Sequence, residues 1–160
     1  MMAICGIDPG ITGGITFMTE RHLICKPVPI ETFKVGGKQR KFLSVTSICE
    51  LLDDYSPTMI FIEKQQAMPK QGVVSTFRTG FGYGLYLGLI VASGYKYIEV
   101  RPQQWKKDLN VSADKNKARQ RATELMPDAS VCWEKANQDG IAESALIAYW
   151  GMNYSLDCLY

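Results

Sequence analysis

The segment Met59 to Ile62 is an uninterrupted apolar run that ends at an acidic residue, Glu63. A run of this kind is typical of a strand at the centre of a sheet that is covered on both faces, because neither side of the strand then meets water. A second apolar run begins at Ala3 and ends at Asp8. The sequence therefore predicts two buried strands that each carry a carboxylate at the end.

Three more strands are predicted from short apolar segments between turn residues. Pro9-Gly10 and Gly13-Gly14 are turn signals that separate the first strand from a second one at Ile15 to Met18. A third strand is expected at Leu23 to Val28, and another at Lys96 to Val100. Together with the two acid-terminated runs, these segments predict five strands.

Helical spacing of apolar residues predicts four helices. They are Phe42 to Tyr55, Gly72 to Ser93, Ala113 to Met126 and Asp139 to about Tyr154. The polar, glycine-containing segment Lys34 to Lys41 is expected to be a flexible loop. Early hairpins followed by strand–helix alternation predict an α/β fold: a mixed five-stranded sheet flanked by helices on both faces. A chain of 160 residues fits one domain, residues 1–160.

Composition restricts the class of protein. The chain is 46% hydrophobic and 21% charged, which excludes wholesale disorder. Its five cysteines include no Cys-x-x-Cys pair and it has a single histidine, so we expect no zinc site and a reducing, cytoplasmic compartment. Met1 leads directly into the first strand, so we expect no signal peptide. The uncharged stretch Thr79 to Tyr95 has 17 residues, six of them glycine or serine, and is expected to form a buried helix rather than a membrane span.

Charge is distributed unevenly along the chain. Residues Arg101 to Arg121 include seven basic and two acidic side chains, and Lys34 to Lys41 includes four basic ones and no acid. From Ala122 onward there are six acids and one base. This distribution indicates either a polyanion-binding face beside a cation-binding site, or simply solvated helix surfaces.

Two further acids begin the last helix. Asp139 and Glu143 lie on one helical face because they are four residues apart. Like charges in this position repel unless a cation lies between them. With Asp8 and Glu63 they would form an all-oxygen site suited to Mg²⁺ or Mn²⁺, and two such ions about 3.5–4 Å apart can support phosphodiester cleavage. Each acid taken singly could instead cap a turn.

Three motifs resemble those of RuvC-type Holliday-junction resolvases. The segments are Ile4 to Gly13 (ICGIDPGITG), Ile60 to Lys64 (IFIEK) and Asp139 to Ala148 (DGIAESALIA). The resemblance implies an RNase H-like fold and Mg²⁺-dependent nicking of four-way DNA junctions at two ions per site, with Mn²⁺ as a substitute and no nucleotide cofactor. The implied metal ligands are Asp8, Glu63, Asp139 and Glu143, and Lys115 occupies the position of a catalytic basic residue.

The chain departs from the bacterial pattern at two places. The bacterial enzymes space their last two acids three residues apart, whereas Asp139 and Glu143 are four apart, as in the phage and organellar branches. Bacterial enzymes also carry an aromatic residue shortly after the strand-end glutamate, and the segment Lys64 to Pro69 has none. The residues that would open a junction are therefore not indicated by the motif.

Basic residues outside the acidic motifs are candidate DNA ligands, because lysine and arginine neutralise phosphates. These candidates are Lys38, Arg40, Lys41, Lys64, Lys70, Arg78, Arg101, Lys106, Lys107, Lys117 and Arg119. Each of them could equally serve only solubility.

A stripe of glycines lies on one face of the helix expected at residues 72–93. Gly80, Gly84 and Gly88 are four apart, which permits close backbone approach. We expect this face to pack on the sheet. The alternative is contact between two copies, in which the aromatic residues of the same helix would take part: Phe77, Phe81, Tyr83 and Tyr86. A four-way junction needs two symmetric nicks, so the resemblance implies a homodimer with twofold symmetry.

Three other functions compete with a junction resolvase. A different RNase H-like nuclease, acting on hybrids, flaps or other branched DNA, would use the same acids. A catalytically inactive junction-binding module is the second alternative, although all four acids are present. An actin-like ATPase or kinase shares the first motif, but 160 residues cannot hold its second lobe and no Gly-x-x-x-x-Gly-Lys-[Ser/Thr] is present.

Overall fold

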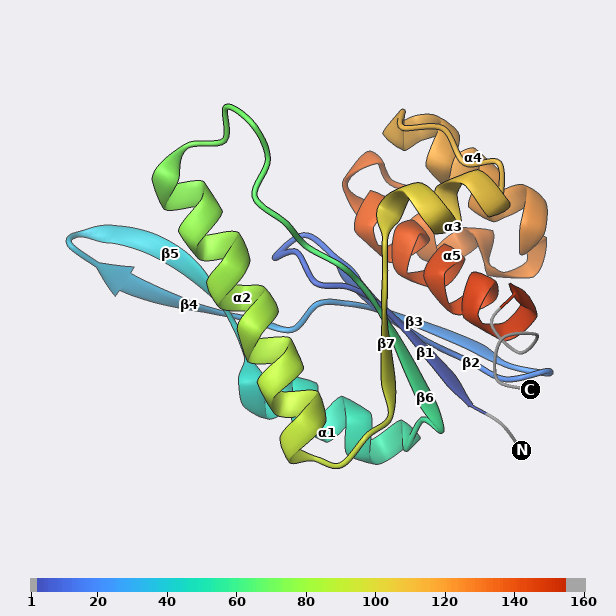
Figure 1. Ribbon diagram of the computed structural model, residues 1–160, viewed down its shortest axis with the longest axis horizontal. Helices are drawn as coiled ribbons and strands as arrows, with labels where there is room; N and C mark the ends of the chain where they lie inside the picture. Colours follow the sequence, from blue (N-terminus) through green and yellow to red (C-terminus); the bar gives the residue numbers. More distant parts are fainter. Residues whose placement is uncertain (1–2, 155–160) are drawn as a thin grey trace.

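A five-stranded mixed sheet forms the centre of the molecule in this computed structural model, in which residues 3–154 are described (Figure 1). Its strand order is β3-β2-β1-β6-β7. The strands are β1 (Ile4–Asp8), β2 (Gly14–Met18), β3 (Leu23–Pro27), β6 (Met59–Glu63) and β7 (Tyr97–Val100). The first three are antiparallel neighbours, whereas β1, β6 and β7 run parallel. All five predicted strands are confirmed.

Helices cover both faces of this sheet (Figure 1). They are α1 (Val45–Tyr55), α2 (Val73–Ala92), α3 (Pro102–Asp108), α4 (Lys115–Leu125) and α5 (Asp139–Tyr154), with 3₁₀ turns at Pro127–Trp133 and Ala136–Gln138. Alternate residues of β1 enter two separate cores: Ile7 packs with Leu52 of α1 and Ile90 of α2, and Ile4 with Leu146 of α5. The sheet flanked on both faces, predicted from the sequence, is confirmed. No helix formed by residues 3–154 has the length and hydrophobicity of a membrane span.

Helix α5 lies against β1 and β2 with almost no side chain between them. A Cβ atom at Gly6 of β1 would overlap the backbone of Ser144 and lie 2.8 Å from the Cβ of Ala148. A Cβ at Gly14 of β2 would lie 2.6 Å from the Ser144 hydroxyl, which is itself 2.8 Å from the hydroxyl of Thr16. Glycine at these two positions therefore sets how closely the helix approaches the sheet.

The expected loop at residues 34–41 is wrong. These residues belong to a hairpin of β4 (Ile30–Val35) and β5 (Lys38–Leu43), which forms a separate two-stranded sheet. Gly36 and Gly37 turn the chain with φ of 59° and 78°, a conformation that favours glycine. Phe42 belongs to β5 and pairs with Glu31 of β4. The next helix therefore begins at Val45 and not at Phe42. A Gly-Gly pair between alternating residues was the hairpin signal.

The glycine face of α2 does not pack on the sheet, contrary to expectation. Nothing lies within 4 Å of a Cβ built at Gly80, Gly84 or Gly88. The opposite side of the helix faces the core through Tyr86 and Ile90, which are buried. Larger residues make the contact with the sheet, so the glycine stripe points away from it.

Replacing Gly6 by alanine should destabilise the fold, because α5 must move away from β1 to admit the methyl group. We expect the free energy of unfolding to fall by about 1–3 kcal/mol or more in urea titrations. Gly82→Ala is the matched control: its Cβ would make an ordinary 3.5 Å contact with Leu43 in the middle of α2, so stability should rise by about 0.5–1 kcal/mol. A Gly6→Ala chain as stable as the parent would contradict this account of the packing.

Candidate active site

Four carboxylates from three parts of the chain meet at one edge of the sheet. Asp8 ends β1 and Glu63 ends the parallel neighbour β6, and the residues before them, Ile7 and Ile62, are paired. Asp139 is the first residue of α5 and Glu143 follows one turn later. An isolated bridge between Gly13 and Gly140 holds the start of this helix beside the turn that follows β1. The predicted gathering of the acids therefore has a structural basis.

The electrostatic state of Asp8 shows how close the acids are. The pKa of Asp8 is raised from 3.8 to about 8. Burial is the largest cause, and repulsion from Glu143, Glu63 and Asp139 contributes to the same increase. The backbone N–H of Gly10 donates to Asp8 Oδ1 at 3.4 Å and opposes the increase only in part. A negative charge on Asp8 is therefore costly without a compensating cation.

Glu63 is held by two neutral donors. The indole Nε1 of Trp105 donates to Glu63 Oε2 at 3.0 Å, and Gln65 Nε2 donates to Oε1 at 3.2 Å. Burial and the charge of Glu143 raise the pKa of Glu63, while these hydrogen bonds and Lys106 partly offset the increase. Trp105 lies on α3, a helix that the sequence analysis did not predict, and is fully buried. Its contact with Glu63 was not predicted, because the two residues are 42 positions apart and no local sequence pattern indicates such a contact.

Two lysines neutralise the acids of α5. Lys106 Nζ lies 2.9 Å from Glu143 Oε1, and Lys115 Nζ lies 2.5 Å from Asp139 Oδ2. The hydrogen bond to Asp139 is the main reason that the pKa of Lys115 is raised. The structure thus brings Lys115 to the acidic cluster, as the sequence resemblance implies. It also brings Lys106 to the acidic cluster, a residue that was predicted from the sequence only as a DNA ligand.

The donor set has the chemistry of a site for a hard divalent cation. All its ligand atoms would be carboxylate oxygens, which Mg²⁺ and Mn²⁺ prefer. Four carboxylates face two ammonium groups, so the cluster has a formal excess of two negative charges that one divalent ion would balance. In the described conformation of residues 3–154, no three histidine, cysteine or acidic side chains lie close enough together to hold an ion. Binding of a cation would therefore need the carboxylates to move closer together.

The other predicted DNA ligands are spread over the molecule. Lys38, Arg40 and Lys41 lie on β5, Arg78 on α2, Lys64 and Lys70 after β6, Arg101 and Lys107 at α3, and Lys117 and Arg119 on α4. Figure 1 places the β4–β5 hairpin and α4 at opposite ends of the molecule. Arg119 donates to the carbonyl oxygens of Trp133 and Glu134, so its guanidinium supports local structure. Lys64 pairs with Glu99 at 3.8 Å.

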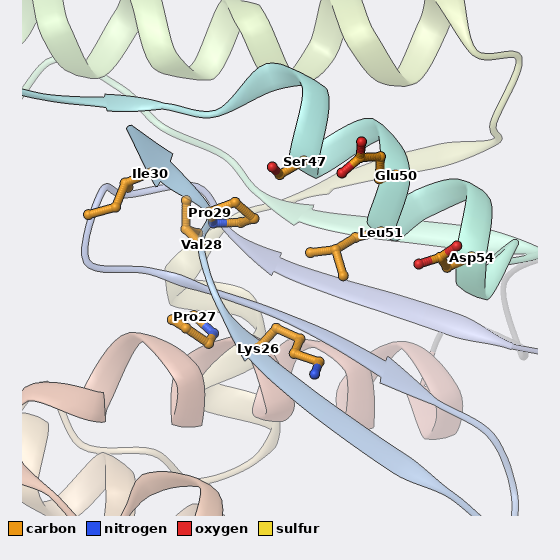
Figure 2. Close-up of a pocket in the computed structure, with 9 residues that line it drawn as sticks. All are labelled: Lys26, Pro27, Val28, Pro29, Ile30, Ser47, Glu50, Leu51 and Asp54. Carbon is orange, nitrogen blue, oxygen red and sulfur yellow. The ribbon is translucent and has the colours of Figure 1, made fainter. Parts of the chain in front are cut away.

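A surface groove lies away from the acids, between β3 and α1 (Figure 2). Its volume is about 480 Å³ and its walls come from residues 26–30 and from one side of α1. None of the four acids lines it, so it is separate from the acidic cluster.

The raised pKa of Asp8 predicts how stability depends on pH when no divalent ion is present. Between pH 3.8 and about pH 8 the folded chain retains a proton that the unfolded chain has released, so the free energy of unfolding falls as the pH rises. Asp8→Asn cannot ionise and should melt at a higher temperature than the parent near pH 8 in chelator, with the difference shrinking toward about pH 5. Asp54→Asn, on an exposed helix end, is the control and should change little. A parent chain at least as stable as Asp8→Asn near pH 8 would contradict the assignment.

Comparison with known proteins places this arrangement in a known fold. No protein-family model matches the sequence, and no curated protein matches it. The structure is similar to Thermus thermophilus RuvC in complex with a Holliday junction substrate, with a TM-score of 0.66 and 17% sequence identity over 98% of this chain and 96% of that one. It is also similar to T. thermophilus RuvC in another structure (TM-score 0.59, 17% identity, 94% and 95% covered). A third similar structure is the yeast mitochondrial Holliday junction resolvase Ydc2 (TM-score 0.57, 19% identity, 92% and 77% covered). The chain therefore has the RNase H-like fold that these resolvases share.

Proposed function

We propose that this chain is a structure-selective endonuclease that resolves four-way DNA junctions by paired nicks. The observation that supports this most is the convergence of Asp8, Glu63, Asp139 and Glu143 at one sheet edge, with Asp8 partly buried and near the other three. The fold is shared over nearly the whole chain with a protein whose structure was solved with a Holliday junction substrate. Together, the acids supply the chemistry and the fold supplies the class of substrate.

The cation in this proposal is Mg²⁺, with Mn²⁺ as a substitute and two ions per site. When bound, the ions would supply the Lewis acidity that phosphodiester hydrolysis needs. Asp8 would be the central ligand, because the other three acids lie near it and the Gly10 N–H offsets only part of the cost of its charge. Trp105 and Gln65 would keep Glu63 in position, since each donates to a different oxygen of its carboxylate.

The two lysines at the acids of α5 have a second task in this proposal. In the described structure Lys106 and Lys115 neutralise Glu143 and Asp139. If a divalent cation takes over that neutralisation, both ammonium groups become available to phosphate oxygens of the DNA. Lys115 suits this role because its side chain is 72% exposed. A positive charge placed there would stabilise the negative charge that develops on the scissile phosphate.

Residues 3–154 form one such cluster, so two symmetric nicks would require two copies. Helix α2 is the proposed contact. Phe77 and Phe81 are 72% and 57% exposed, and their rings stack at a centroid distance of 6.2 Å. Gly80, Gly84 and Gly88 leave open space beside these rings, into which side chains of a second copy could fit. An exposed aromatic pair is a surface that association would remove from water.

A nicking assay on a synthetic four-way junction tests the function. With Mg²⁺ we expect symmetric nicks, with chelator none, and little cleavage of RNA–DNA hybrids or flaps. Asp8→Asn should abolish nicking and leave junction binding intact, because it removes a ligand but no positive charge. Glu50→Gln, on the exposed side of α1, is the control and should cut normally. Full activity of Asp8→Asn, or equal cleavage of hybrids, would refute the proposal.

Sedimentation equilibrium in the micromolar range tests the dimer. The parent chain should be dimeric, and Phe77→Glu combined with Phe81→Glu should be monomeric, because the contact would bury two uncompensated charges. Val131→Glu is the matched control, since Val131 is 67% exposed but lies on the 3₁₀ turn after α4. A monomeric parent chain would count against the α2 interface.

A further inference from the structure

The β4–β5 hairpin extends away from the central sheet (Figure 1). Every residue from Ile30 to Phe42 is exposed, and of the hairpin only Leu43 packs against a core. The hairpin is anchored at its base, where the N–H of Ser44 donates to the Pro29 carbonyl at 2.9 Å and its hydroxyl donates to Glu31 at 2.7 Å. A two-stranded hairpin this exposed is marginal by itself. The stability of the fold therefore does not explain its exposed side chains.

One side of the hairpin combines aromatic and basic side chains. Strand register pairs Phe33 with Arg40 and Val35 with Lys38, and places Phe42 on the same side. The rings of Phe33 and Phe42 lie 5.8 Å apart, and the two residues are 52% and 40% exposed. We call this side, with Glu31, the aromatic face. The opposite side carries mainly polar residues, among them Thr32, Lys34, Gln39 and Lys41.

The charge of the hairpin points to the chemistry of its ligand. Four basic residues, Lys34, Lys38, Arg40 and Lys41, stand against one acid, Glu31, whose carboxylate already accepts from Ser44. A symmetric contact between two aromatic faces would bring like charges together, which disfavours a second copy of the chain as the occupant. An apolar protein surface would leave these cations without partners. A polyanion with flat apolar rings fits both properties, and unstacked nucleic-acid bases have this chemistry.

We propose that the aromatic face binds unpaired bases at the branch point of a DNA junction. Phe33 and Phe42 stack on the exposed bases, and Arg40 and Lys38 contact the adjoining phosphates. Aromatic side chains stack on every base, so this contact recognises the unpaired state and not the sequence. The inference deepens the proposed function and rests on it for the nature of the substrate, and it gives the hairpin the task of selecting branched over regular DNA.

Fluorescence anisotropy with three labelled DNAs tests the proposal, in chelator so that no strand is cut. The probes are a four-way junction, a duplex with a three-thymine bulge and the same duplex without the bulge. Combined Phe33→Ala and Phe42→Ala should weaken binding to the bulged duplex and the junction about tenfold, with plain duplex binding changed less than about twofold. Phe33→Tyr with Phe42→Tyr should keep the parent affinities, because tyrosine also stacks.

Two further variants separate stacking from other effects. Phe33→Leu with Phe42→Leu keeps apolar bulk on the hairpin and should still lose the preference for the bulge. Thr32→Ala with Gln39→Ala alters the opposite side and should keep it. The alanine pair removes the contact between the two rings, so the leucine pair decides the question if the alanine pair fails to fold.

The outcomes are distinct. Retained preference for the bulge in the leucine pair, or an equal loss on plain duplex, overturns the proposal. Conversion of the leucine pair to a monomer while the parent is a dimer also overturns it, because the face would then contact a second copy. If the parent nicks no four-way junction, the proposed function fails, and the bulged duplex still decides whether the hairpin binds unpaired bases.

Discussion

The arrangement of the whole site depends on a contact in which glycine replaces a side chain between α5 and the first two strands. Gly6 and Gly14 let the helix backbone and the Ser144 hydroxyl approach to distances that a Cβ atom would forbid. This approach places the first turn of α5 beside the end of β1. Asp139 and Glu143 therefore reach Asp8 because the helix packs this tightly against the two strands.

The acidic cluster is balanced by residues that a purely structural site would not need. Asp8 is partly buried and close to like charges, while Lys106 and Lys115 neutralise the two acids that begin α5. Helix α3 supplies both Lys106 and the Trp105 hydrogen bond to Glu63, so this short helix positions two of the four carboxylates. Like-charged carboxylates at one place, two of them paired with lysines, are more typical of a functional site than of pairs that only stabilise the fold.

The surfaces proposed for DNA and for a second copy of the chain have different physical characters. On α2, the rings of Phe77 and Phe81 lie beside open glycines and Arg78 is the one basic residue of the helix, which suits contact with an identical surface. On the β4–β5 hairpin, rings alternate with cations, which suits a ligand that is both apolar and anionic. Leu43 at the root of the hairpin lies next to Gly82 of α2, so the two surfaces are neighbours in the fold.

The sequence by itself determined the five strands of the central sheet and four of the helices, because apolar periodicity is a local pattern. It also determined where the four acids lie on these elements, at two strand ends and at the start of α5. The β4–β5 hairpin was not predicted, because its strands are rich in charged residues and resemble a polar loop around Gly36 and Gly37. The prediction that the α2 glycines pack on the sheet was wrong. Only the tertiary structure decided which partner each acid has. Trp105 meets Glu63 across 42 residues and Lys106 meets Glu143 across 37. Such pairings depend on how α3 and α5 pack against the sheet. A local sequence pattern contains no information about which residues that packing brings together.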